Sequence, residues 1–156
     1  MGYVEKLEAA YGPPSQKGFG GAVFHEVLQP ADDLATAALA KYRHFVGRLW
    51  SRFGEQAWMG PWREVYARPS GAGRDIVAEL RGIEDAEAKR SVDLLLDAME
   101  NAAEARAALA VAFDDPAEKE LRVFNIGDGA AMSGLLVAGR RAAAGDGATY
   151  VIVLMD

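Results

Sequence analysis

The residues best suited to binding chemistry lie in an irregular stretch in the first half of the chain. Tryptophan, tyrosine and arginine dominate binding hot spots, and arginine also stacks on tryptophan or clamps carboxylate and phosphate groups. Irregular loops on rigid scaffolds are where such residues concentrate. The plainer alternative, which carries more weight, is that the tryptophans fill the core and the arginines are solvated. The candidate ligand- or partner-binding residues are Arg48, Arg52, Trp58, Trp62, Arg63 and Tyr66.

Histidine and serine chemistry has few candidates. The sequence contains two histidines, His25 and His44, which lie 19 residues apart and lack the H-E-x-x-H spacing of a zinc protease. No serine sits in a G-x-S-x-G elbow. We therefore assign no catalytic residue, and the sequence leaves open whether any reaction is catalysed. We expect His25 to be half-buried on a strand and His44 to lie on a helix surface.

Metal and cofactor sites are no better supported. Thiolate-based zinc sites and iron–sulfur clusters are excluded because the sequence has no cysteine. Asp93 and Asp97 share a helix face that could bind a hard cation, but such a stripe is more typical of the wet side of an amphipathic helix. The glycines of residues 125–134 lack G-x-G-x-x-G spacing and precede a predicted strand, which favours a hairpin turn over a phosphate loop. No metal and no cofactor is predicted.

The charge is acidic overall but unevenly distributed. A net charge of −6 argues against nucleic acid as the main partner. Eight basic and four acidic residues lie between Lys41 and Arg81, a balance that could attract an anionic ligand, although a solvated helix face is the more ordinary interpretation. No apolar run approaches the roughly 20 residues of a membrane span, and the first residues lack a signal-peptide core. We expect a cytoplasmic protein without membrane contact and a single domain over residues 1–156.

Helices are predicted where apolar residues recur every three or four positions. A short helix is expected over 3–11 and another over 32–53, which begins after Pro30 with two aspartates near its positive end. The strongest periodicity predicts a helix over 84–113. Thirty residues would span roughly 45 Å, so this helix is either broken, packed on a second copy or extended beyond the core. One or two helical turns are expected over 75–80.

Strands are predicted mainly in the last third of the chain. Residues 120–126, 132–140 and 149–155 are separated by Asp-Gly pairs, which favour tight hairpins and hence an antiparallel meander. Residues 21–28 form a further possible strand, and 62–67 is either strand or loop. The last strand is apolar on both faces, which requires two covers. One cover would be helices, and the other would be the N-terminal segment or another subunit.

These patterns predict an α+β fold in which N-terminal helices pack on a C-terminal three-stranded meander, with an N-terminal strand as a possible extension. The leading functional hypothesis is a small, soluble, non-catalytic binding or regulatory protein that acts through protein–protein contacts or homo-oligomerisation. Its partner would be another protein or a second copy of the chain. The alternative is a binding domain or enzyme for an anionic small molecule. Nucleic-acid binding ranks third.

Overall fold

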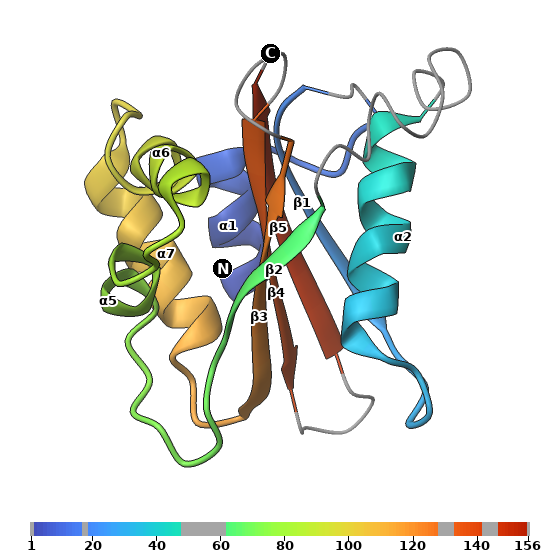
Figure 1. Cartoon of the computed structure of the whole chain (residues 1–156). Helices are drawn as coiled ribbons and strands as arrows, with labels where there is room; N and C mark the ends of the chain where they lie inside the picture. Colours follow the sequence, from blue (N-terminus) through green and yellow to red (C-terminus); the bar gives the residue numbers. More distant parts are fainter. Residues whose placement is uncertain (1, 17–18, 48–61, 128–132, 142–146, 156) are drawn as a thin grey trace.

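The protein has an α+β fold built on one five-stranded antiparallel sheet (Figure 1). The computed structural model describes residues 2–16, 19–47, 62–127, 133–141 and 147–155. The strand order is β1-β5-β4-β3-β2, so the first two strands of the chain form the two edges. The strands are β1 (Gly20–Val27), β2 (Arg63–Ala67), β3 (Glu118–Ile126), β4 (Ser133–Arg141) and β5 (Gly147–Met155). The helices are α1 (Tyr3–Tyr11), α2 (Leu34–Val46), α5 (Ile76–Arg81), α6 (Ala86–Leu96) and α7 (Ala102–Phe113).

The predicted meander forms the centre of this sheet. Strands β3, β4 and β5 pair in sequence order with antiparallel registers, and β1 adds to β5 as the expected N-terminal extension. The predicted sheet, of three strands with one possible extension, is nevertheless too small. The structure adds β2, which pairs with β3 as a fifth strand. The sequence left residues 62–67 undecided since five residues beside a Gly-Pro turn give too little alternation to identify a strand.

Helices cover both faces of the sheet. In Figure 1, α1, α5, α6 and α7 lie on one face and α2 lies on the other. The first face contributes Val23, Val123 and Val151 to a buried cluster with the four helices. The second face contributes Phe124 and Tyr150 to a cluster with α2. The prediction placed the helices in the N-terminal part of the chain. Helices α1 and α2 do lie there, but α5, α6 and α7 come from the middle of the chain.

Strand β5 obtains both of its covers from its own chain. Its residues from Ala148 to Leu154 are buried, and they alternate between the two clusters. Val151 and Val153 face the α1 side, while Tyr150 and Ile152 face α2. A strand that is apolar on both faces therefore needs no second subunit here, because α1 and α2 lie on opposite sides of it (Figure 1).

The helix expected over 84–113 is broken into α6 and α7. Helix α6 begins at the N-cap Asp85, whose side chain accepts from the backbone N–H groups of Glu87 and Ala88, and α7 begins after Asn101. Arg106 of α7 donates to the Leu96 carbonyl, which satisfies an acceptor at the end of α6. A straight helix of roughly 45 Å would extend past strands of nine residues, which span roughly 30 Å. Because the helix is broken, the apolar faces of α6 and α7 can both pack on the sheet.

Helix α2 is predicted at the right place, and its start has a clear physical cause. The Asp33 carboxylate accepts from the backbone N–H and the hydroxyl of Thr36, which caps the first turn. The described helix ends at Val46 with Gly47 at φ +61°, which glycine adopts readily. The rest of the expected 32–53 helix, from residue 48 on, lies outside the described residues.

Candidate functional site

Trp62, one of the predicted binding residues, is partly buried and stacks against the core on the α2 face. Its ring lies between those of Tyr42 and Phe124, with centroid distances of 5.4 and 4.9 Å and interplanar angles of 21° and 10°. Trp62 directly precedes β2, so this stack joins the sheet edge to α2 and to β3. These contacts give Trp62 a structural role.

Arg63 and Tyr66 contact the helices on the opposite face. Arg63 donates to Asp85 at 2.6 Å and to Glu87 at 3.3 Å, which attaches β2 to the start of α6. The Tyr66 hydroxyl donates to Glu79 of α5 at 2.5 Å. Burial, together with this hydrogen bond, raises the pKa of Tyr66 to about 12.

The aromatic–arginine segment is thus divided between the two faces of the sheet. Trp62 belongs to the α2 cluster, whereas Tyr66 packs against the cluster on the other face. Arg48, Arg52 and Trp58 lie outside the described residues. A binding role for these residues stays a prediction.

Strand β1 is an open edge of the sheet. Among the described residues it pairs with β5 alone, over eight residues without a register shift. Phe24 and Leu28 face α2, while Val23 faces α1. Val27 lies at the end of the strand and is 63% exposed. An unpaired edge presents backbone N–H and C=O groups that can pair with another chain.

The chain that leads into β1 passes from the α1 side of the sheet to the α2 side. The Tyr11 carbonyl packs on Gly21 from the α1 side, where an added Cβ would approach it to 2.3 Å. The chain then reaches α2, where the amide of Gln16 lies 3.4 Å from the Nδ1 atom of His44. We take the second half of β1, residues 23–27, as the open part of the edge.

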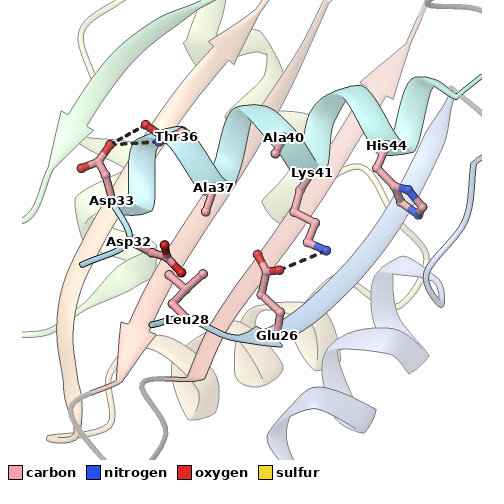
Figure 2. A pocket seen from close by; sticks show the side chains of 9 residues that line it. All are labelled: Glu26, Leu28, Asp32, Asp33, Thr36, Ala37, Ala40, Lys41 and His44. Carbon is pink, nitrogen blue, oxygen red and sulfur yellow. Dashed lines mark hydrogen bonds and ion pairs between the residues drawn. The ribbon is translucent and has the colours of Figure 1, made fainter. Parts of the chain in front are cut away.

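A groove of about 330 Å³ lies beside this strand, between β1, α2 and the turn that joins them (Figure 2). This volume is near the lower end of the range of ligand pockets, about 300–1,000 Å³. Small side chains of α2 make its wall, and charged groups stand around it. The lining residues are Glu26, Leu28, Asp32, Asp33, Thr36, Ala37, Ala40, Lys41 and His44.

Glu26 is the half-buried carboxylate of the groove. One of its oxygens lies 3.3 Å from the ammonium group of Lys41, an ion pair drawn in Figure 2. The other oxygen accepts from the hydroxyl of buried Tyr150 at 2.7 Å. Burial, with the hydrogen bond to Glu26, raises the pKa of this hydroxyl well above its ordinary range, so it remains a donor to the carboxylate.

Asp32 and Asp33 give the groove an acidic end. Both are exposed, and hydrogen bonds from the Thr36 backbone and hydroxyl hold the pKa of Asp33 below its ordinary value. One oxygen of Asp32 accepts from the backbone N–H of Gln29, which closes the turn. Buried Arg140 of β4 donates to the carbonyls of Asp32 and Gln29, at 2.6 and 2.9 Å, and so holds this turn against the sheet.

The histidines lie on the two sides of the same edge. His25 is on β1 as expected, but its side chain is exposed and not half-buried; its Nδ1 atom is 2.9 Å from the Thr149 hydroxyl. His44 is exposed on α2 as expected, and its ring meets Phe24 edge-on at 5.6 Å. His25 thus lies on the α1 side of β1, and His44 of α2 contacts the opposite side of the strand.

A second groove, of about 580 Å³, lies between α1 and α7. Alanines make up half of its lining residues, the others include Lys6 and Glu104, and Val111 is 46% exposed.

One buried carboxylate stands apart from both grooves. Glu118 at the start of β3 is 2% exposed, and one of its oxygens has no hydrogen-bond partner among the described residues. Its other oxygen accepts from Arg141 at 3.3 Å. Burial raises the pKa of Glu118 to about 7, against the opposing effect of the Arg141 charge.

Sequence reasoning missed the groove beside β1. It predicted the strand and the helix start separately, but gave no reason to place them together. The available signal was a predicted strand without lysine, arginine or proline, joined by a short acidic turn to an amphipathic helix. Edge strands are usually protected from further pairing by such residues. A strand without them is therefore either central in its sheet or an open edge.

The described ranges contain neither a metal-binding cluster nor a membrane-spanning helix. No group of three or more histidine, aspartate or glutamate side chains there is arranged to hold a metal ion. No helix in those ranges is long and apolar enough to cross a membrane. No protein-family model, curated protein or solved structure matches the chain.

Proposed function

We propose that this is a non-catalytic binding protein that captures another polypeptide at the open edge of β1. The single observation that carries the proposal is the juxtaposition of this unpaired edge with the groove beneath α2. An added strand forms main-chain hydrogen bonds with the edge, and a neighbouring pocket receives alternate side chains. Both parts of that recognition mode are present along residues 23–28.

The exposed apolar residue at the strand end supports the same proposal. Val27 is the most exposed of the large hydrophobic side chains that the structure describes, at 63%. A partner strand that pairs with β1 would cover it. The β1 groove gives no support to the alternative of an anionic ligand, because Glu26, Asp32 and Asp33 line it.

Site-specific photo-crosslinking tests the proposal. A benzoylphenylalanine replaces Val27 in one variant and Val111, on the α1–α7 groove, in a matched control. In extracts of the source cells, we expect the Val27 variant to form an adduct with one identifiable polypeptide and the Val111 variant to form none with it. The purified partner should then protect the amides of residues 23–27 from hydrogen exchange.

Three outcomes are distinguishable. An adduct with a second copy of the chain would place homo-oligomerisation at the same edge. An adduct with another protein would identify a heterologous partner. Equal labelling from both positions, or no protection of residues 23–27 by the purified partner, would contradict the proposal.

A further inference from the structure

We infer that the segment captured at β1 is an extended one that carries a basic side chain on its α2-facing side. This inference rests on the proposed function, since it requires pairing with the β1 edge. It adds the chemistry of the partner. The argument uses the direction of the side chains along β1 and the charges at the end of the groove.

Strand geometry determines where the side chains of a partner point. A strand added to β1 would lie about 4.8 Å from it, and residues opposite one another would share a face of the sheet. Phe24 and Leu28 belong to the α2 cluster, and Glu26 lies between them on the same face. Partner residues opposite these positions therefore point into the groove, and their neighbours point toward the side of Val27.

The charges of the groove favour a cation at one end. The turn after β1 contributes Asp32 and Asp33, both exposed, and the hydrogen bonds that the structure gives each of them use one oxygen. Lys41 is engaged with Glu26, and Arg140 is buried with its guanidinium directed to the turn carbonyls. Asp32 and Asp33 therefore each keep a carboxylate oxygen that can accept a hydrogen bond from a lysine or arginine of the partner.

The rest of the molecule favours the same occupant. The chain has a net charge of −6, which attracts a basic segment over long range. Ala37 and Ala40 have small side chains, which leave space along the α2 wall of the groove. The aliphatic part of a long basic side chain can lie there while its charged group reaches the aspartates.

Three capped seven-residue peptides test the inference. Each alternates threonine and valine, and the central residue is arginine, glutamate or threonine. Binding is followed by amide chemical shifts of residues 23–27 at low salt. We expect the arginine peptide to bind about tenfold more tightly than the glutamate peptide, as one charge-assisted hydrogen bond would give. We expect this preference to fall as salt is raised.

Variants of the protein locate the preference. The double variant Glu26→Gln with Asp32→Asn keeps similar shapes and removes two charges, and we expect it to reduce the preference to less than about threefold. Glu104→Gln on the α1–α7 groove is the matched control and should leave it unchanged. Asp33 is left intact because it caps α2.

The outcomes separate the inference from the proposed function. Equal binding of all three peptides at residues 23–27 would overturn the basic partner while leaving edge pairing intact. A preference that survives in the double variant would overturn the assignment to this groove. An arginine peptide that still binds after backbone N-methylation would show that its charge is recognised without strand pairing, which overturns the proposed function. The same holds if no peptide shifts residues 23–27.

Discussion

The two edges of the sheet are built differently. Strand β1 runs for eight residues in continuous register with β5 and contains no lysine, arginine or proline. Strand β2 has five residues, a register shift between Glu64 and Tyr66, and charged residues at its start. Short length, bulges and charges are the usual means by which an edge is protected from further pairing. Within the described residues, β2 has all three of these protections, whereas β1 has only one charged residue, Glu26, which is paired with Lys41 on the α2 side.

The side-chain contacts follow the same division. At β2, Trp62 and Arg63 tie the edge to elements on both faces, and Arg122 of β3 is paired with Glu64 at 2.7 Å. Behind it, Arg68 binds Glu79 at 2.6 Å with both side chains largely buried. The groove beside β1 holds one ion pair and exposed carboxylates. Side-chain contacts thus fasten β2 to both faces of the sheet, whereas β1 has fewer of them among the described residues, which is why we propose β1 as the binding edge.

The largest expected effect on stability is at the β2 edge. Replacing Trp62 by alanine removes the stack with Tyr42 and Phe124, and we expect the free energy of unfolding to fall by about 3 kcal/mol. Urea denaturation measures this change. Trp62→Phe, which retains an aromatic ring, should cost less than about 1.5 kcal/mol. A loss below about 0.5 kcal/mol for the alanine variant would mean that the stack does not anchor this edge.

The second effect is a pH dependence of stability that originates at Glu118 of β3. The pKa of Glu118 is about 7 in the folded chain and near 4.5 when unfolded. Between these pH values the carboxyl is ionised in the unfolded chain but still protonated in the folded chain. Its contribution to the free energy of unfolding is therefore fully present below about pH 4.5 and is lost as the pH rises through 7. From pH 4 to pH 8, we expect the wild-type protein to lose roughly 3 kcal/mol relative to Glu118→Gln.

Denaturation midpoints across this range, measured for both proteins, check the prediction. Glu120→Gln on the same strand is the control, because Glu120 is only half-buried and is paired with Arg122 at 2.6 Å. It should keep the wild-type pH profile. Parallel profiles for wild type and Glu118→Gln would show that Glu118 is not buried as a neutral acid.

The smallest effect on stability is expected at the open edge. Val27→Lys should change the free energy of unfolding by less than about 0.5 kcal/mol, because the side chain is 63% exposed. It should nevertheless abolish partner capture, since a lysine on an edge opposes strand addition. Val111→Lys is the matched control and should leave capture intact. Hydrogen-exchange protection of residues 23–27 by the partner measures the difference, and unchanged protection in Val27→Lys would contradict the comparison.

Much of the fold was predictable from local pattern. The Asp-Gly breaks and the apolar last strand predicted the central meander, and Asp33 indicated the start of α2. A break in the helix over 84–113 was one of three alternatives that the sequence left open, because the apolar period continues across residues 97–101 while the length limit comes from the sheet. The partners of Arg63 lie 22 and 24 residues away in sequence, and no local rule selects them.

The sequence by itself determined the α+β class, the antiparallel meander and the absence of cysteine chemistry, because these depend on composition, turn residues and side-chain period. The tertiary structure decided which strands form the edges, and therefore which one is open. It also decided that Trp62 and Tyr66 face opposite sides, and that Glu26, Asp32 and α2 form one groove. Edge position depends on the order of strands in space, which is set by long-range packing and not by the periodicity of any single segment.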